Sequence, residues 1–191
     1  LLFKYSRENT GEHWSEKVAE QLCHALQIPH VDYKMARMNG RLGIMTTNIV
    51  PKESRMVMGN EVLHKDSPSN YPRNEQIVRI KEHTISRVLG CLDKSNISPP
   101  QTRYNISNLN AGDIFCGYLM LDALISNQDR HHENWAIIVN NETGQMYLCP
   151  SYDHAASLGR ELLDSERNER LKTNDKNRTV TKFVSKARSE L

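Results

Sequence analysis

The chain has 191 residues, of which 38% are hydrophobic, and a formal net charge of +2. This size and composition suit one large domain or two small lobes around a packed core. The small net charge gives no sign of direct nucleic-acid binding. The longest apolar stretch, residues 115–125, is shorter than the roughly 20 residues that a membrane-spanning helix needs, so we expect no membrane partner.

Four cysteines are spread along the chain without a CxxC pair, and each lies in or beside an apolar segment. Such thiols are typical of the core of a protein in a reducing compartment. We therefore expect a cytoplasmic protein whose cysteines are reduced and buried. These cysteines are Cys23, Cys91, Cys116 and Cys149.

The first 26 residues predict a strand followed by a helix. Residues 1–5 are apolar and aromatic apart from Lys4, which suits a short strand. Residues 12–26 follow a polar turn and carry apolar side chains at helical spacing, which indicates a helix that buries one stripe. Glu16 lies off this stripe and need not belong to the core. The stripe consists of Trp14, Val18, Leu22, Ala25 and Leu26.

A hairpin is expected next. Strands are predicted within residues 30–37 and 40–49, and the dipeptide Asn39-Gly40 between them favours a tight hairpin turn. The following stretch, residues 52–73, is polar and irregular.

This irregular stretch is where we place the boundary between two lobes. The N-terminal lobe would comprise residues 1–62 and the C-terminal lobe residues 63–191. We expect Trp14 and Trp135 to anchor the core.

The second lobe is predicted to be mainly helical. Helices are expected at residues 76–89 and 112–126, the second of them apolar nearly all round and therefore buried. Residues 135–139 and 145–149 read as two strands of a hairpin with a glycine-containing turn. The tail at residues 167–188 is rich in Lys and Arg, which is typical of a solvated helix face.

Three oxygen-bearing side chains should meet at one end of this second hairpin. A turn centred near Glu142 would pair Val139 with Gln145, which brings Asp153 close to the loop that holds Asp129 and Asn134. Carboxylate and amide oxygens suit a hard divalent cation, and Mg²⁺ is commonly held by one or two carboxylates together with substrate phosphates.

The spacing within this loop favours phosphoryl transfer. The step of five from Asp129 to Asn134 matches the step from base to metal ligand in the catalytic loop of protein kinases. Such kinases also use a strand lysine on the nucleotide phosphates and a glutamate on the next helix. Lys4 and Glu16 have this order here.

Three segments together resemble the HipA-like kinase family. They are Asn-Gln-Asp-Arg-His-His-Glu-Asn-Trp at residues 127–135, Ser-Tyr-Asp-His-Ala-Ala-Ser-Leu at residues 151–158, and Glu-His-Trp-Ser-Glu-Lys at residues 12–17. The resemblance implies an α+β, two-lobed, protein-kinase-like fold with a reduced strand-rich N-terminal lobe and a mostly helical C-terminal lobe. It also implies an ATP- and Mg²⁺-dependent serine/threonine kinase.

The resemblance assigns roles to individual residues. Asp129 would be the catalytic base, Asn134 and Asp153 the Mg²⁺ ligands, Lys4 the phosphate-contacting lysine and Glu16 its partner. A second set supports these groups: His131 would stabilise the catalytic loop beside the base, and the segment with Met58 and Asn60 would contact the adenine.

Members of this family are often toxins of toxin–antitoxin modules. The resemblance therefore implies a protein substrate with a Ser or Thr acceptor, such as a translation component, and an antitoxin as a candidate partner. Two departures from the kinase pattern stand out. The Gly-rich loop expected before Lys4 is absent from these residues, so a chain that truly began at Leu1 should bind ATP weakly, and Asp153-His-Ala replaces Asp-Phe-Gly.

Three alternatives stay open. Clustered His and Asp could form a zinc or dinuclear hydrolase centre. The catalytic loop also resembles that of phosphoinositide kinases, which would make the acceptor a lipid. Finally, the chain could be a kinase-shaped binding module without activity. The hydrolase centre would use Asp129, His131, His132, Asp153 and His154. In the kinase interpretation His132 is instead expected to be partly exposed.

Overall fold

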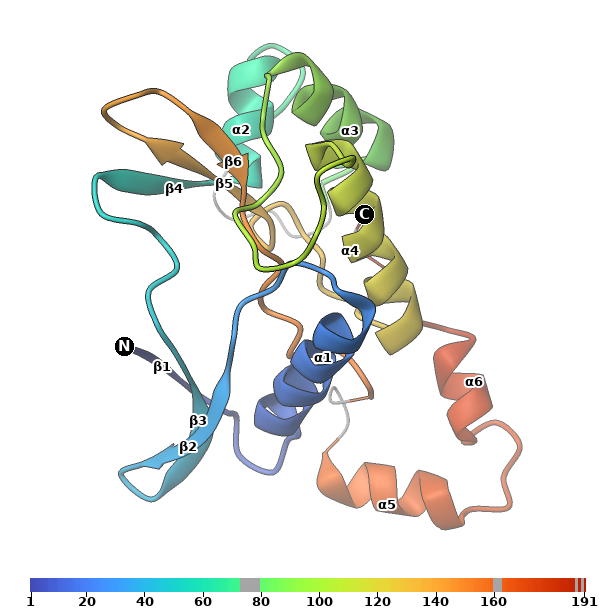
Figure 1. Ribbon diagram of the computed structural model, residues 1–191. Helices are drawn as coiled ribbons and strands as arrows, with labels where there is room; N and C mark the ends of the chain where they lie inside the picture. Colours follow the sequence, from blue (N-terminus) through green and yellow to red (C-terminus); the bar gives the residue numbers. More distant parts are fainter. Residues whose placement is uncertain (73–79, 160–162, 188, 190) are drawn as a thin grey trace.

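The computed structural model describes residues 1–72, 80–159, 163–187, 189 and 191. Two three-stranded antiparallel sheets lie at one side of the molecule, and helices cover the other side (Figure 1). The first sheet lies beside helix α1, and the second lies beside α2 (Figure 1). The expected α+β architecture is confirmed.

The first sheet contains the predicted N-terminal hairpin. Its strands are β1 (Leu2–Tyr5), β2 (Lys34–Met38) and β3 (Arg41–Thr46), in the order β1-β3-β2. The turn between β2 and β3 consists of Asn39 and Gly40, whose φ angles are 51° and 77°. Positive φ at both positions is the requirement of a type I′ turn. The prediction from this dipeptide is therefore confirmed.

Helix α1 (Glu12–Leu26) has the predicted bounds, but it buries a different face. Val18 and Leu26 of the expected stripe are 41% and 53% exposed, whereas Glu16 is 0% exposed. Trp14 is only half-buried and so is not a core anchor. The inward face is unusually polar, which indicates that its side chains pair with polar groups in other parts of the chain. Its buried residues are Glu12, Ser15, Glu16, Ala19, Glu20 and Cys23.

The second sheet contains the second predicted hairpin. Its strands are β4 (Ser54–Met58), β5 (Ala136–Asn140) and β6 (Met146–Leu148), in the order β4-β5-β6.

The register of this hairpin differs from the prediction by one residue, since Val139 pairs with Met146 and not with Gln145. Asn140 explains the shift. Its side-chain oxygen accepts hydrogen bonds from the backbone N–H groups of Glu142 and Thr143, which favours a four-residue turn.

The change from one sheet to the other falls between Thr46 and Ser54. Strand β4 pairs with β5, which directly follows the candidate catalytic loop. The predicted division at residue 62 therefore does not coincide with the change of sheet. The division itself stays a prediction.

Three helices pack around the main core. They are α2 (Gly59–Asp66), α3 (Ile85–Lys94) and α4 (Ala111–Ile125). The helix predicted at residues 76–89 begins at Ile85, after the capping residue Thr84, and residues 76–79 lie outside the described part of the chain.

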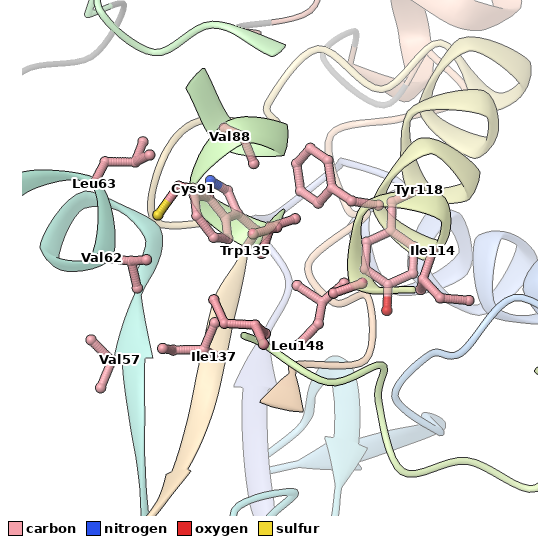
Figure 2. Packing of buried hydrophobic residues seen from close by; sticks show 14 of the residues in the cluster. Val57, Val62, Leu63, Val88, Cys91, Ile114, Tyr118, Trp135, Ile137 and Leu148 are labelled. Carbon is pink, nitrogen blue, oxygen red and sulfur yellow. The ribbon is translucent and has the colours of Figure 1, made fainter. Parts of the chain in front are cut away.

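Helix α4 has nearly the predicted bounds, and a capping box of Asn110 and Asp113 starts it. Only one face of it is buried, since Met120 and Leu124 on the other face are 74% and 61% exposed, so the prediction of a buried helix is wrong for that face. Trp135 is the centre of the core, as predicted. Figure 2 shows the packing around it by residues that include Val57, Leu63, Val88, Ile114, Tyr118 and Leu148.

Gly59, at the start of α2, allows a close approach to this core. A Cβ atom at this position would lie 2.2 Å from Trp135 Cε2, so a side chain could not be accommodated without movement of the indole ring. The candidate catalytic loop and α2 are therefore held in direct contact.

The C-terminal helices α5 (Asp164–Lys172) and α6 (Val180–Val184) have no buried residue, which agrees with the predicted solvated tail. Cys23, Cys91 and Cys149 are buried, but Cys116 is exposed on α4, so the prediction of four core thiols is wrong for this residue. Among the described helices, none is long and apolar enough to cross a membrane.

Candidate functional site

A buried arginine, Arg130, holds the candidate catalytic loop in place through hydrogen bonds. Arg130 is fully buried, and its guanidinium contacts both carboxylate oxygens of Asp122 on α4, at 2.7 and 2.8 Å. It also donates to the backbone oxygen of Asn134 at 2.7 Å and to Ser151 Oγ at 3.1 Å. One side chain thus joins α4, the loop and the segment after β6.

The five-residue step from Asp129 to Asn134 is closed by hydrogen bonds. The side-chain nitrogen of Asn134 donates to the backbone oxygen of Asp129 at 2.5 Å. Asn127 accepts from the backbone N–H of Asp129 and donates to the buried Asp122. The amide nitrogen of Asn134 is therefore committed, which leaves its oxygen as the atom that can bind a cation. The Asp129 side chain is 44% exposed.

The two histidines of the loop have different surroundings. His131 accepts a hydrogen bond from the backbone N–H of Glu133, and its Nε2 lies 3.8 Å from an Asp129 oxygen. His132 was expected to be partly exposed, but it is buried and bonded to the Tyr71 hydroxyl at 2.6 Å. The expectation fails because α2 and the following turn cover this part of the loop. Burial lowers the pKa of His132 below its ordinary value.

The segment after β6 brings Asp153 to the first sheet. Tyr152 donates its hydroxyl to the backbone oxygen of Glu133 at 2.8 Å, which fixes this segment against the loop. Asp153 has a φ of 54°, a left-handed conformation that Asp tolerates better than most residues. Its Oδ1 lies 2.6 Å from Lys4 Nζ on β1. Two residues 149 positions apart in sequence therefore form an ion pair.

Glu16 supports this segment from α1. Its Oε1 accepts a hydrogen bond from the backbone N–H of His154 at 2.8 Å and lies 3.3 Å from His154 Nδ1. The other ring nitrogen of His154 is 2.7 Å from Ser151 Oγ. All three side chains are buried, so these contacts hold the segment in place and a substrate cannot reach them.

The predicted pairing of Lys4 with Glu16 is electrostatic and not a direct bond in this structure. Burial alone would lower the pKa of Lys4, but the carboxylates of Asp153, Glu16 and Glu12 outweigh it and raise that pKa above its ordinary value. The second oxygen of Glu16, Oε2, is buried and makes no hydrogen bond within the described residues.

Met58 and Asn60 lie against the candidate catalytic loop, and polar groups of this segment are already hydrogen-bonded to it. Met58 Sδ accepts a long contact from the Tyr152 hydroxyl, and the Asn60 side chain donates to Glu133. The backbone N–H groups of Gly59 and Asn60 already donate to Trp135 and His132. The predicted contact with adenine stays a prediction.

The site contains several supporting residues that the sequence did not single out. The arginine inside the Asp-Arg-His motif and the serine before Tyr-Asp-His carried a signal through their position in the motifs. Asp122 on α4 carried no such signal, because the sequence does not show which residue pairs with an acidic side chain in an apolar helix. These residues are Arg130, Ser151 and Asp122.

The residues of the alternative hydrolase centre are not gathered into a metal cluster. His154 is engaged with Glu16 and Ser151, and His132 with Tyr71. In the part of the chain that the structure describes, one group of three metal-ligating side chains lies within reach of a common ion, and it is elsewhere, at Glu20, His30 and Asp32.

The chain matches no protein-family model, and a search of curated proteins finds no match. Its structure is similar to the crystal structure of a Helicobacter pylori proinflammatory kinase, CtkA, with a TM-score of 0.71 and 14% sequence identity. The match covers 99% of this chain and 62% of that kinase, so the chain spans less than two thirds of its structural neighbour.

This likeness shows that the chain has a kinase-like fold. At such low identity the likeness concerns the fold alone. Membership of the HipA-like family stays a prediction.

Proposed function

We propose that this protein is an ATP-dependent kinase that transfers the γ-phosphoryl group to a serine or threonine hydroxyl of a protein. The contact between Lys4 Nζ and Asp153 at 2.6 Å is the observation that carries the proposal. Protein kinases use a strand lysine that contacts the phosphates and a carboxylate that binds the metal, and we assign these roles to Lys4 and Asp153.

The side chains present fit Mg²⁺ and ATP. Asn134 and Asp153 offer amide and carboxylate oxygens, which is the donor set that Mg²⁺ prefers. Lys4 offers an ammonium group beside Asp153, and its raised pKa keeps it charged at neutral pH. When bound, Mg²⁺ would neutralise the phosphate charge and align the phosphates for in-line transfer.

Three residues would then divide the work of the reaction. Asp129 would orient the acceptor hydroxyl and take its proton as the oxygen attacks the γ-phosphorus and the bond to ADP breaks. Lys4 would move from Asp153 to the phosphates. Glu16 Oε2, which makes no hydrogen bond within the described residues, would accept from Lys4 while Asp153 binds the metal.

His131 takes a positioning role in this proposal. Its ring accepts from the backbone of Glu133 and lies beside the Asp129 carboxylate. It would therefore hold the loop and tune the base without touching the reacting atoms.

The motif resemblance also supports a finer proposal. A toxin-type kinase with a cytoplasmic protein as substrate, such as a translation component, and an antitoxin as partner is consistent with the HipA-like segments. The structural neighbour is described as proinflammatory, which is a property of that protein and does not identify the substrate of this one.

Transfer of label from [γ-³²P]ATP tests the proposal. The protein is incubated with Mg²⁺, labelled ATP and a bacterial protein extract, and labelled proteins are hydrolysed for phosphoamino-acid analysis. We expect phosphoserine or phosphothreonine, and no label when EDTA replaces free Mg²⁺.

Two other outcomes would contradict the proposal and identify an alternative. Label on phosphatidylinositol vesicles, with none on protein, would identify a lipid kinase. Absence of ATP binding by calorimetry at millimolar nucleotide would favour a catalytically silent binding module.

A further inference from the structure

A buried histidine nitrogen outside the candidate catalytic site makes no hydrogen bond within the described residues. The His30 side chain is 1% exposed, and its Nδ1 lies 2.7 Å from the backbone oxygen of Ile28. A carbonyl can only accept, so Nδ1 carries a proton, and in the neutral ring Nε2 then presents its lone pair. That Nε2 is buried without a hydrogen-bond partner, which is costly unless another group or an ion binds there.

Two carboxylates surround this lone pair. Glu20 on α1 is buried, and Asp32 follows His30 in the loop before β2. One ligand atom from each of the three residues lies within 4.8 Å of the other two. His30 Nε2 is 3.6 Å from Asp32 Oδ1, which is too long for a hydrogen bond. Two tetrahedral ligands that each lie about 2.1 Å from Zn²⁺ would be separated by about 3.4 Å.

We propose that Glu20, His30 and Asp32 form a site for a divalent transition metal, with Zn²⁺ as the best fit. An imidazole with two carboxylates favours Zn²⁺ over Mg²⁺ or Ca²⁺, which prefer oxygen ligands alone. The backbone oxygen of Ile28 fixes the tautomer and orientation of the ring, as outer-shell acceptors do for zinc-bound histidines. Asp32 is 64% exposed, so the fourth position would face solvent.

Two cations compete with the metal for the carboxylates. Lys17 and Gln21 both contact Oε2 of Glu20, which leaves Oε1 for the ion. Arg103 contacts both oxygens of Asp32, at 3.2 and 3.4 Å. The metal must therefore displace Arg103 from at least one oxygen, so removal of this arginine should strengthen metal binding.

The site would join α1 to the segment that leads to Asp153. Ser151 donates its N–H to the backbone oxygen of Pro29 at 2.9 Å, and its own oxygen accepts from Val31 at 3.0 Å. His30 lies between these two hydrogen bonds. A bound ion would thus fix α1 relative to the Ser151 segment and should raise the thermal stability of the protein.

Titration of the whole chain with Zn²⁺, against a chromophoric chelator at pH 7.5, tests the proposal. We expect binding at one ion per chain and a rise in Tm. Asp32→Asn, which changes an exposed side chain, should weaken the affinity by about 100-fold or more, by analogy with the loss caused by weaker outer-shell changes. His30→Gln should do the same, and Asp32→Asn keeps the test informative if His30→Gln unfolds.

Three further variants define the controls. Arg103→Gln should tighten binding by about two- to fivefold, because an exposed ion pair no longer competes. His24→Gln changes a neighbouring exposed histidine outside the set and should leave the affinity unchanged. Asp153→Asn should also leave it unchanged, which separates this site from the proposed Mg²⁺ site. Equal Zn²⁺ affinity in the wild type and Asp32→Asn, or no stoichiometric binding in the wild type, would overturn the proposal.

Discussion

Two sets of polar residues in and around the candidate functional site differ in their exposure. Asp122, Arg130 and His154 are buried, and their polar groups are paired with each other or with neighbours. The Lys4 and Asp129 side chains are about half exposed.

The difference separates support from chemistry. The buried polar groups can be removed only by leaving a charge or donor unpaired inside the protein, which destabilises the fold. The exposed groups are held in place by the buried set and are open to a substrate. Substitutions in the first set should therefore reduce stability, and substitutions in the second should reduce activity.

The largest loss of stability is expected for Asp122→Asn. This change leaves the Arg130 guanidinium buried with a neutral partner, and breaking a buried pair in this way costs about 3–5 kcal/mol. Urea unfolding measures the effect. Asp164→Asn is the matched control, because it removes a surface pair with Arg167 and should change the free energy of unfolding by no more than about 1 kcal/mol. Equal losses in the two variants would show that the buried set is not the support.

Lys4→Met should have the opposite effect, with a large loss of activity and little loss of stability. The ion pair with Asp153 is partly exposed, so its loss should change stability by about 1 kcal/mol or less. Loss of a cation that stabilises transferring phosphate should lower the rate of phosphoryl transfer by about 10²–10³-fold. Initial rates at saturating ATP measure this. A Lys4→Met variant that loses stability but retains its rate of phosphoryl transfer would show that Lys4 supports the fold and not the reaction.

His132 should make the fold sensitive to acid. Burial lowers the pKa of His132 in the folded chain, while the unfolded chain titrates near its ordinary value of about 6.5. The unfolded state then binds more protons, so the contribution of His132 is complete above about pH 6.5 and is lost as the pH falls towards the lowered pKa. Urea unfolding from pH 8 to 5 should show a smaller acid loss in His132→Gln. An unchanged slope would contradict this origin.

Val18→Ala should have the smallest effect. Val18 is 41% exposed on the outer face of α1, and surface substitutions of this kind usually change stability by about 0.5 kcal/mol or less. Cys23→Ala on the buried face should cost more, because its side chain is fully buried. Thermal unfolding of the two variants compares the faces. A larger loss in Val18→Ala would restore the apolar stripe as the packed face.

The elements that could be predicted depend on local signals. The turn at Asn39-Gly40, the bounds of α1 and the position of helix α4 all follow from short-range spacing or from residues with special backbone angles. The register of the second hairpin was wrong by one residue because the side chain of Asn140 sets the turn length, and the hydrophobic pattern does not report that hydrogen bond.

The candidate site could be predicted only in part, for the same reason. The motif placed Asp129 and Asn134 together, since their hydrogen bond spans five residues. The burial of Glu16 could not be predicted, because its partner His154 lies 138 positions away. The amphipathic spacing of α1 predicts that Glu16 points outward, whereas the contact with His154 places it in the interior.

The most direct test of the central claim measures activity and stability together in Asp129→Asn. Asp93→Asn, an exposed position on α3, is the matched control. We predict that phosphoryl transfer falls by about 10²–10⁴-fold in Asp129→Asn, while its free energy of unfolding stays within about 0.5 kcal/mol of the wild type and the control retains both. Transfer at the wild-type rate in folded Asp129→Asn would contradict the account.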